Sequence, residues 1–573
     1  MHIDRLAVKN FRNLADVEVR LLPGAVVVGE NRAGKSNLLH ALRLILDGSL
    51  SYADRQLTRE DFWDGLSDGS DDWDPMAEGC VIEASIDIVE FEDDKRLIAA
   101  LKDALLAEDP MRARLTYRFA PVDVGDLTVK QKYRGTVYGG NDSERSIPAD
   151  VRSYLYLVFL HALRDVEADI KSWRRSPLRA LLQGAASAAS DDDLGEVRNA
   201  MKEANTKLNE LDVVRELGGN IGQRLIDMVG ENHAVDTELA VAPDDPLRLI
   251  RNMRLFIDGD ARRPLSGASL GTLNVLYLVL HELGRDTRLL DDSDIAHVVM
   301  AIEEPEAHLH PHLQRLVFRR LLDEQTHPST VLVTTQSPHI ASVADPRSLV
   351  VLRTVQGRTV AAEAHTADLD HAEWDDIARY LDATRAELVF ARRVLLVEGF
   401  AEQVLVPKLA EAIDINLDKH GISVCAIHGT HFTAYAKFCE ALGIPWAIFT
   451  DGDIDKEGKS QGQLRAAALM AALGKTGSPH EHGIFVGQRT LEHDLLTADS
   501  RNIESCFGTL TELCKSPSAA TVEAWNGRDP GHDAFMKMIK NAGGKGRYAQ
   551  RLALRLVHPP EYIATALDYL VGR

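Results

Sequence analysis

The chain has 573 residues, a formal net charge of −22, 45% hydrophobic residues and 27% charged residues. This length predicts several domains, and the composition is that of a globular protein. No run of 18 apolar residues is present and the charged N-terminal segment lacks the apolar block of a secretory signal, so we expect no membrane span. The five cysteines form no CxxC pair, which argues against a zinc ribbon or a disulfide framework. These features predict a cytoplasmic protein.

The acidic balance taken alone argues against a nucleic-acid partner, because phosphate binding requires lysine and arginine. Much of the acid, however, is clustered in residues 61–74, 191–193 and 291–294. Charge runs of this kind are typical of solvated loops. A locally basic binding face therefore remains compatible with the overall charge.

The N-terminal part of the chain combines predicted strands with a Gly-rich loop. Alternating or continuous apolar residues predict strands at 5–8, 17–21, 25–28, 81–91 and within 115–140. A helix is expected over 37–46, directly after the Gly-rich loop, and an Asp/Gly/Ser-rich surface loop over 64–79. Residues 154–182 and 196–229 are predicted to be helical, with a break in the small and acidic segment 184–195.

The second half of the chain changes pattern twice. Strands are expected at 255–257, 298–302 and 331–335, with a helix over 272–283, and the polar segment 355–375 is interpreted as a boundary. After it, strands and helices alternate: the predicted strands are 394–397, 423–427 and 445–450, and the predicted helices are 402–413 and 433–442. Such alternation is typical of a parallel α/β sheet.

A phosphate-binding loop is present between the third predicted strand and the first helix. Residues 29–36 read GENRAGKS and fit the pattern GxxxxGK[ST] in the required context. Backbone N–H groups from Gly29 to Gly34, including that of Asn31, would surround the phosphates at a helix N-terminus. Lys35 would reach the β and γ phosphates of ATP, and the Ser36 hydroxyl would bind Mg²⁺.

Two carboxylates end an apolar strand about 260 residues later. In the segment HVVMAIEEPE, residues 297–306, Glu303 would hold the Mg²⁺ shell and Glu304 would orient or deprotonate the attacking water. The following segment VLVTTQSPH, residues 331–339, places Gln336 where a switch residue would contact the γ-phosphate. Gln336 can donate a hydrogen bond but cannot be protonated.

The Gly/Ser-rich segment 265–272, LSGASLGT, lies in the position of an ABC signature. A signature would cap the γ-phosphate of a partner subunit's ATP with a helix N-terminus. A plain loop that enters a helix fits the same residues, so both interpretations stay open. The first interpretation predicts at least a dimer.

Four carboxylates follow two strands of the C-terminal pattern. Glu398 and Glu402 come directly after the strand at 394–397, and Asp451 and Asp453 follow the strand at 445–450. Carboxyl ends of parallel strands face one crevice, and alternate residues of an extended chain point the same way. Grouped carboxylates repel one another unless a divalent cation compensates them, and oxygen ligands suit Mg²⁺ or Mn²⁺.

These motifs resemble known families. The pattern hhhEGxxE followed by hhhxDxD is similar to the Toprim domain, and the segment NFRNL…VVVGENRAGKSNLLHAL resembles the RecF/SMC-like branch of ABC ATPases, which often has glycine in place of Arg32. Their fusion resembles the OLD (overcoming lysogenization defect) nucleases, a family that includes the nuclease component of the Gabija defence system. Residues 160–165, LHALRD, are similar to the ALRD motif of that family.

The resemblance implies an α/β fold class, with a RecF/SMC-like ABC ATPase head, a helical dimerisation insertion and a following Toprim domain. The expected divisions are 1–165 and 246–385 for the two parts of the ATPase, 166–245 for the helical insertion, and 390–573 for the Toprim domain with a C-terminal helical extension. It further implies a metal-dependent endonuclease, acting in phage defence or DNA repair, that cuts double-stranded DNA under the control of ATP bound with Mg²⁺.

The resemblance also adds two residues to the site. Glu492, in the segment TLEHDL, would be a further metal ligand, and Lys545, in GGKGRYA, would contact the scissile phosphate or stabilise the developing charge. Two Mg²⁺ or Mn²⁺ ions per Toprim site are implied, the first held by Glu398, Asp451 and Asp453, the second by Glu402 and Glu492. The catalytic set would then be Glu398, Glu402, Asp451, Asp453, Glu492, Lys545 and Glu304.

Other functions fit parts of the pattern. A topoisomerase or primase is disfavoured because no strand-cleaving tyrosine module and no zinc ribbon is recognisable. An ATP-driven DNA clamp with a non-cleaving Toprim domain, and a Toprim nuclease that acts on RNA, remain alternatives. The expected partners are DNA, ATP, further copies of the chain and, from the Gabija resemblance, a UvrD-like helicase.

Overall fold

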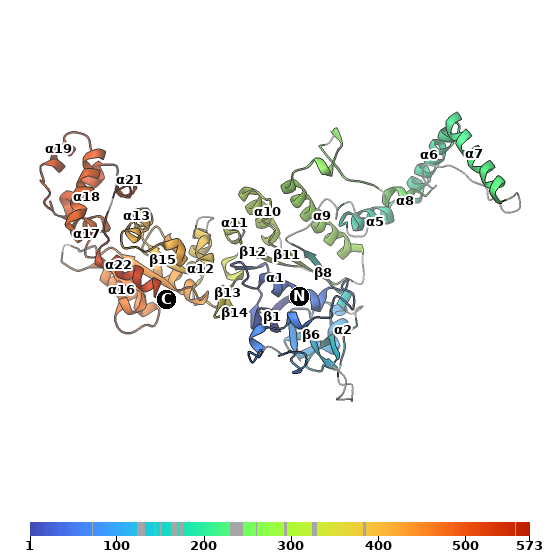
Figure 1. Cartoon of the computed structure of the whole chain (residues 1–573), viewed down its shortest axis with the longest axis horizontal. Coiled ribbons are helices and arrows are strands. Elements are labelled where there is room, and N and C mark those ends of the chain that lie inside the picture. The colour runs from blue at the N-terminus through green and yellow to red at the C-terminus, as the bar shows by residue number, and fades with distance from the viewer. Residues whose placement is uncertain are drawn as a thin grey trace.

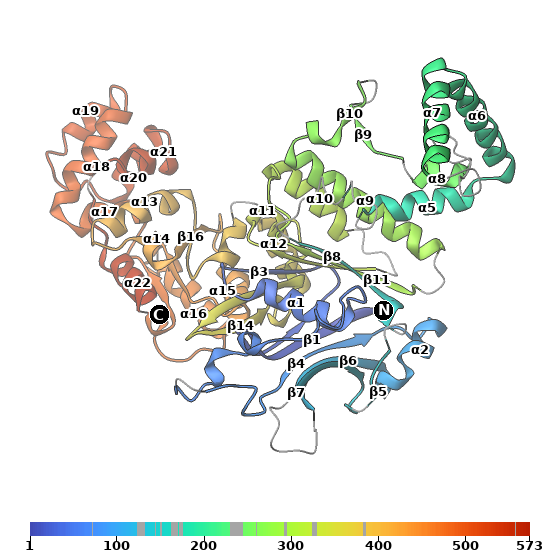
Figure 2. The same cartoon turned by 45° about the vertical axis from the view of Figure 1, so that its right-hand side comes forward.

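The structure, a computed structural model, contains three larger β-sheets with helices packed between and around them (Figures 1 and 2). It describes residues 1–70, 73–122, 132–143, 145–148, 152–161, 170, 176–229, 245–251, 253–258, 261–291, 295–323, 329–381, 385–455, 457–555 and 557–572. Most of the LHALRD motif lies outside the described residues. No helix in the described ranges is long and apolar enough to cross a membrane.

The first sheet is antiparallel and belongs to the N-terminal part of the chain. Its strands run in the order β2-β1-β4-β6-β5, and β7 also pairs with β6. Their bounds are β1 His2–Phe11, β2 Leu14–Arg20, β4 Ile82–Val89, β5 Leu105–Glu108, β6 Met111–Val122 and β7 Lys132–Gly139, with helix α2 at Lys95–Leu101. The strands predicted in this region are therefore confirmed.

The second sheet is mainly parallel and has the order β14-β13-β3-β12-β11-β8. Its strands are β3 Ala25–Gly29, β8 Leu155–Leu160, β11 His297–Glu303, β12 Ser329–Thr335, β13 Leu349–Val355 and β14 Arg358–Glu363. Here the prediction of helix from residue 154 is wrong, because β8 pairs in parallel with β11. The prediction of a polar boundary over 355–375 also fails: β13 and β14 form an antiparallel hairpin, and α12 (His371–Tyr380) follows with Trp374 buried.

Helix α1 (Lys35–Leu46) packs between the first two sheets. Strand β3 explains how both faces of the second sheet are filled, since successive side chains point to opposite faces. Ala25 and Val27 join the core that contains α1, whereas Val26 and Val28 join the core on the other face. That other face is covered by α9 (Leu270–Asp291), α10 (Pro311–Asp323) and α11 (Pro338–Ala341).

A helical arm extends from the part of the chain that contains the second sheet (Figures 1 and 2). It consists of α5 (Leu178–Ala188), α6 (Asp191–Asn209), α7 (Asp212–Val229) and α8 (Pro246–Arg251), and α5 connects it to the body by packing on α9. The predicted break is confirmed at 189–190, where Ser190 accepts a hydrogen bond from Asp193 N as the N-cap of α6. The short strands β9 (Phe256–Ile257) and β10 (Arg263–Pro264) form a separate pair.

The third sheet lies in the C-terminal part and is entirely parallel, with the order β16-β15-β17-β18. Its strands are β15 Arg393–Val397, β16 Ile422–Ala426, β17 Trp446–Thr450 and β18 Ile484–Val486. The helices are α13 Phe400–Glu411, α14 Leu417–His420, α15 Phe432–Ala441, α16 Gln461–Ala472, α17 Leu491–Ala498, α18 Ser500–Leu513, α19 Ser518–Glu523, α20 His532–Asn541, α21 Lys545–Leu552 and α22 Glu561–Val571.

The C-terminal sheet is buried on both faces. Leu395 and Val397 face a core that contains α13, α17, α18 and α20 to α22. Val394 and Leu396 face α15 and α16, in a core that continues through α12 into the ATPase part. Because both faces are covered, the strands are continuous apolar runs, as the sequence predicted.

Candidate functional site

The carboxylates that follow β15 and β17 meet at one edge of the third sheet. β15 and β17 are parallel neighbours, so Glu398 and Asp451, the residues after their ends, lie side by side. Asp451 N donates a 3.0 Å hydrogen bond to Glu398 Oε1, and the Thr450 hydroxyl donates to the same oxygen. Leu491 N, at the start of α17, donates to Asp451 Oδ1 at 2.8 Å, which fixes the helix that carries Glu492 against the strand ends.

Gly452 allows the chain to turn between the two aspartates. A Cβ at this position would lie 2.4 Å from Gln488 O and 2.5 Å from Gly487 O, closer than real Cβ contacts. The next residue, Asp453, has φ +44°, a left-handed conformation that aspartate adopts more readily than most residues. Glycine between the two aspartates is therefore required by the close approach of the loop that follows β18.

Burial disfavours the charged form of the carboxylates in this site. Asp451 is 5% exposed, and burial together with the charges of Glu398, Glu492 and Glu402 raises its pKa to about 8, against the opposing effect of Lys545. Burial also raises the pKa of Glu402. Glu492 is fully buried, and its Oε1 accepts no hydrogen bond from the described residues. Burying a carboxylate is costly unless a cation compensates its charge.

Lys545 supplies part of that compensation. It begins α21, which packs against α13, and its Nζ lies 3.2 Å from Glu492 Oε2 and 3.4 Å from Asp451 Oδ2. The two carboxylates hold the pKa of Lys545 above its ordinary value in spite of its burial. The structure thus brings together the residues that the sequence placed in one site, namely Glu398, Glu402, Asp451, Asp453, Glu492 and Lys545.

Arg465 is a further member of the site that the sequence did not indicate. It lies on α16, and its Nη2 donates to Glu398 Oε1 at 3.3 Å, to Asp453 Oδ2 at 3.0 Å and to Asp451 O at 2.7 Å. Its Nε donates to the Thr450 hydroxyl at 3.0 Å. No local pattern distinguishes an arginine in the middle of an ordinary helix, so only the fold could reveal it.

The oxygen-rich donor set suits a hard divalent cation. In the part of the chain that the structure describes, however, no three His, Cys, Asp or Glu side chains are arranged around one point as metal ligands. Arg465 and Lys545 explain this, because each lies between carboxylates that would otherwise share an ion. Glu492, fully buried and with its Oε1 accepting no hydrogen bond from the described residues, is the observation that best fits a divalent cation in addition to Lys545.

The second site surrounds the phosphate-binding loop. Gly34, with φ +98°, is the N-cap of α1, and Lys35 is almost fully buried with its Nζ donating to Gly29 O at 2.8 Å and Glu30 O at 3.1 Å. Arg32 has φ +68°, a left-handed conformation that glycine adopts more readily than arginine. The side chain of Asn13 stabilises this strained turn by donating to Arg32 O at 2.9 Å.

The strand-end carboxylates of the ATPase part face this loop. Glu304 Oε1 lies 3.6 Å from Lys35 Nζ and accepts a hydrogen bond from Gln336 Nε2, so Gln336 orients the second carboxylate. Glu306 accepts hydrogen bonds from Gln336 N at 2.7 Å and the Thr335 hydroxyl at 2.9 Å, and burial raises its pKa. Glu303 is placed beside His161, with 3.9 Å between Nδ1 and Oε2.

A cavity of about 820 Å³ opens over the phosphate-binding loop. Asn31, Ser36 and Lys35 line it together with Glu304. Trp63 also lines the cavity, from a segment held to the β1–β2 turn by hydrogen bonds between backbone groups of residues 61–63 and 10–12. Gln336 and Glu303 do not line the cavity, although Gln336 acts on it through Glu304.

The two sites are connected by an ion pair. Glu30, in the phosphate-binding loop, accepts hydrogen bonds from Arg392 Nε at 2.7 Å and Nη2 at 2.9 Å. Arg392 directly precedes β15, the strand that ends beside Glu398. Arg353, at the end of the neighbouring β13, donates to Ala391 O at 2.9 Å. The ion pair therefore joins the phosphate-binding loop to β15, the first strand of the C-terminal sheet.

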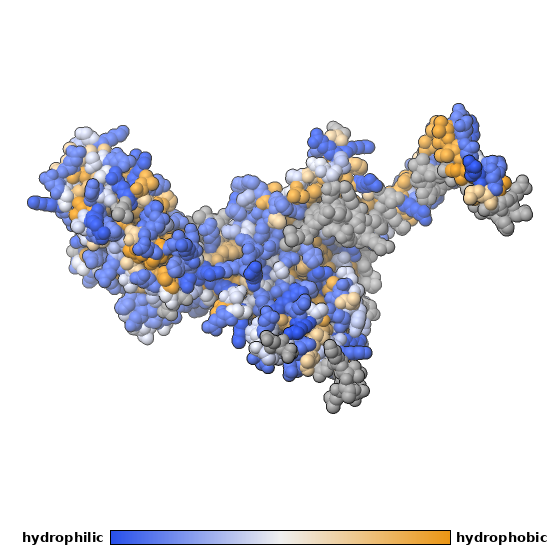
Figure 3. All heavy atoms as spheres, in the orientation of Figure 1, coloured by the Kyte–Doolittle hydropathy of each residue, from blue (hydrophilic) through white to orange (hydrophobic). Residues whose placement is uncertain are grey.

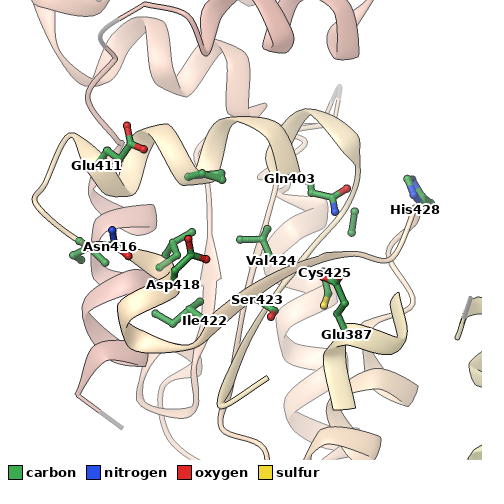
Figure 4. Close-up of a pocket in the computed structure, with 14 residues that line it drawn as sticks. Glu387, Gln403, Glu411, Asn416, Asp418, Ile422, Ser423, Val424, Cys425 and His428 are labelled. Atoms are coloured by element: carbon green, nitrogen blue, oxygen red, sulfur yellow. The ribbon is translucent and has the colours of Figure 1, made fainter. Parts of the chain in front are cut away.

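Another cavity, of about 570 Å³, lies along the free edge of β16 (Figure 4). Gln403 and Glu411 border it from α13, and Ser423 and Val424 from β16. None of the predicted metal ligands lines it. It is therefore separate from the carboxylate site, although both share α13.

Two protein families match the chain. Residues 389–453 match "Overcoming lysogenization defect protein-like, TOPRIM domain". Residues 25–342, more than half of the chain, match "AAA domain, putative AbiEii toxin, Type IV TA system". The first match contains Glu398, Glu402, Asp451 and Asp453, and the second contains the phosphate-binding loop and Glu304.

Named relatives share most of this length. The chain is 22% identical over 499 residues to "Endonuclease GajA" of Bacillus cereus (strain VD045), covering 83% of this chain and 79% of that protein. It is 24% identical to "OLD nuclease" of Thermus scotoductus, covering 79% and 82%. Among solved structures, the C-terminal region of the Burkholderia pseudomallei OLD protein is 33% identical and matches 32% of this chain and 97% of that chain, with a TM-score of 0.29. The chain therefore belongs to the overcoming lysogenization defect (OLD) family and joins an AAA/ABC-type ATPase to a Toprim domain.

Proposed function

We propose that this protein is a divalent-metal-dependent DNA endonuclease whose activity is regulated by ATP. The observation that carries the proposal is the convergence of Glu398, Asp451, Glu492 and Lys545 at the carboxyl ends of a parallel sheet. Two relatives are named as nucleases, one of them as an endonuclease. Such a buried acidic site has no use in a purely structural domain, because it costs stability.

Each residue has a role that its position suggests. Glu398, Asp451 and Asp453 would hold one Mg²⁺ or Mn²⁺, and Glu402 with Glu492 would hold a second. When bound, two such ions supply an activated water and stabilise the leaving oxygen of a phosphodiester. Lys545 would pass from its carboxylates to the substrate phosphate, and Arg547, exposed two residues further on α21, would contact the DNA backbone.

Regulation by ATP is proposed from the second site. Lys35 would exchange the carbonyl oxygens of Gly29 and Glu30 for the β and γ phosphates, while Ser36 and Glu303 would hold Mg²⁺. Glu304, oriented by Gln336, would activate water. Because a glutamine cannot take up a proton, we expect slow hydrolysis.

We also propose that the protein acts as a homo-oligomer through the helical insertion expected at residues 166–245, of which the structure describes helices α5 to α7 of the arm. Val213 is 80% exposed, Leu217 52% and Met228 78%, and Figure 3 shows an apolar patch on α6 and α7. Apolar patches of this kind are typical of protein interfaces. Replacing Val213 and Leu217 with aspartate should lower the molar mass measured by light scattering to that of one chain.

A UvrD-like helicase as partner and a role in phage defence or DNA repair are proposed from family resemblance alone, and a cytoplasmic location is proposed from the composition and the cysteine pattern of the sequence. The division of the chain at residues 165, 245 and 385–390 is likewise proposed as the division into functional units. Co-purification of the chain with a helicase encoded beside its gene would test the first of these.

The test of the nuclease proposal is cleavage of supercoiled plasmid by the purified chain with Mg²⁺ or Mn²⁺, with and without ATP. We expect nicked or linear product from the wild type and none from Asp451→Ala/Asp453→Ala. Single-stranded RNA in parallel reactions separates a DNA nuclease from an RNA nuclease. If the wild type binds DNA and ATP but cuts neither substrate, the ATP-driven clamp takes the place of the nuclease.

A further inference from the structure

Arg465 occupies the position between two predicted metal ligands. The same guanidinium nitrogen, Nη2, lies 3.3 Å from Glu398 Oε1 and 3.0 Å from Asp453 Oδ2. These carboxylates follow different strands, β15 and β17, so the arginine joins the two strand ends from α16. Its side chain is 22% exposed, which limits screening of these contacts by solvent.

Arg465 is held in place by more than the carboxylates. Its Nε donates to the Thr450 hydroxyl at 3.0 Å, and Nη2 also donates to the backbone carbonyl of Asp451 at 2.7 Å. Both of these acceptors belong to the rigid end of β17. The guanidinium can therefore release the carboxylate oxygens and still keep two neutral partners.

The charge of Arg465 is permanent. A guanidinium is not deprotonated in proteins, whereas a lysine can lose its proton when buried. Grouped carboxylates repel one another, and a fixed positive charge keeps them together. The same charge repels a divalent ion that approaches the same oxygens. Arg465 thus stabilises the folded carboxylate site and lowers its affinity for a metal ion.

We propose that Arg465 is a built-in counter-ion of the carboxylate site, which holds Glu398 and Asp453 in position when no divalent cation is bound and sets the concentration of cation needed to displace it. Arg465 is a positioning residue in this scheme, since it acts through Glu398 and Asp453. When the cation binds, the guanidinium would give up Glu398 and Asp453 and keep the Thr450 hydroxyl and the Asp451 carbonyl. The inference rests on the metal site of the proposed function but not on DNA cleavage.

The test compares metal affinity with stability in the full-length protein. Arg465→Gln should lower the Tm in EDTA by about 2–4 °C, because the carboxylates lose their counter-ion. The same variant should bind Mn²⁺ about tenfold more tightly in isothermal titration, because one positive charge is removed from beside the ion. Arg465→Lys keeps the charge and should bind Mn²⁺ with nearly wild-type affinity.

Arg501→Gln is the matched control. Arg501 is exposed and pairs with Asp499, so this variant removes the same charge from the same domain without touching the carboxylates, and its Mn²⁺ affinity should stay within about twofold of the wild type. A residue that only supports the fold would lower both Tm and affinity on removal. An Arg465→Gln variant that binds Mn²⁺ no more tightly than the wild type would overturn the proposal.

The outcomes also separate this inference from the proposed function. If Arg465→Gln binds Mn²⁺ more tightly but the wild type cuts no DNA, the counter-ion stands and the nuclease proposal fails. If neither the wild type nor any variant binds Mn²⁺, the counter-ion is overturned together with the metal site.

Discussion

Replacing Lys545 with glutamine tests the electrostatic account of the carboxylate site most directly. The ammonium lies 3.2 Å from Glu492 Oε2 and 3.4 Å from Asp451 Oδ2, and both carboxylates are nearly or fully buried. With an effective dielectric constant of about 20, each pair of unit charges at these distances interacts by about 5 kcal/mol. The two interactions do not simply add, because a pKa of about 8 leaves Asp451 mostly protonated at pH 7.

The pair with Asp451 therefore contributes less than this value at neutral pH, and the expected effect rests mainly on the pair with Glu492. Since the Lys545 side chain is 42% exposed, solvent screening reduces its value, and we expect Lys545→Gln to lower the free energy of unfolding in EDTA by about 2–4 kcal/mol. Urea unfolding of the full chain measures this difference. Saturating Mn²⁺ should recover at least half of the loss, because a divalent cation compensates the same carboxylates.

Lys475→Gln is a control with the same geometry at the surface. Lys475 Nζ lies 3.2 Å from Glu440 Oε1, but these side chains are 36% and 38% exposed, so the loss should be below about 1 kcal/mol. Equal losses of unfolding free energy for Lys545→Gln and Lys475→Gln would refute the argument that the burial of Glu492 makes its pair with Lys545 strong. A loss for Lys545→Gln that Mn²⁺ does not reduce would refute the assignment of this site to a cation.

Three further predictions concern the backbone of the site and the ATPase head. Gly452→Ala should lower the free energy of unfolding by about 1–3 kcal/mol and abolish Mn²⁺ binding in titration calorimetry, because the added Cβ would strike the carbonyl oxygens of residues 487 and 488. Gly429→Ala is the control and should have neither effect, because the atom nearest to its added Cβ is a side-chain carbon at 3.8 Å. Lys35→Met should weaken binding of a fluorescent ATP analogue at least about 100-fold, and unchanged affinity would exclude the cavity as the nucleotide site. Burial lowers the pKa of His40 to about 4, so the unfolded chain binds a proton between pH 6.5 and 4 that the folded chain does not, and stability falls as pH falls through this window. His40→Gln should therefore lose about 1–2 kcal/mol less than the wild type between pH 7 and pH 5, and parallel losses in urea unfolding would contradict this.

The sequence correctly predicted those parts of the fold in which the periodicity of apolar residues and a sequence motif indicate the same element. Strand β3, the loop over 29–36 and helix α1 follow one another as expected, and so do β15, α13 and β17. The prediction failed for β8, whose residues LYLVFL are all apolar. A short apolar run fits a buried strand and a buried helix equally well, and pairing with β11 decides between them.

The polar hairpin strand β14 was missed for the opposite reason. Its residues RTVAAE include polar and small side chains because β14 is the edge strand of its sheet and is partly exposed. In the carboxylate site, Glu398, Glu402, Asp451 and Asp453 follow from strand-end patterns. Arg465 could not be found in this way, since its role depends on how α16 packs beside strands that are distant in sequence.

The ion pair between Glu30 and Arg392 has a thermodynamic consequence for how the two sites communicate. Lys35 donates a hydrogen bond to the carbonyl of Glu30, and Arg392 directly precedes the strand that ends beside Glu398, so the proposed nucleotide and metal sites lie at opposite ends of one short path. Coupling of binding free energies is reciprocal: any factor by which ATP changes the affinity for Mn²⁺ must equal the factor by which Mn²⁺ changes the affinity for ATP. For an exposed pair worth at most about 1 kcal/mol, that factor is at most about five. Under the proposed function, the path through Glu30 would therefore grade the activity of the Toprim site in proportion to nucleotide occupancy, and it would be too weak to act alone as an on-off switch.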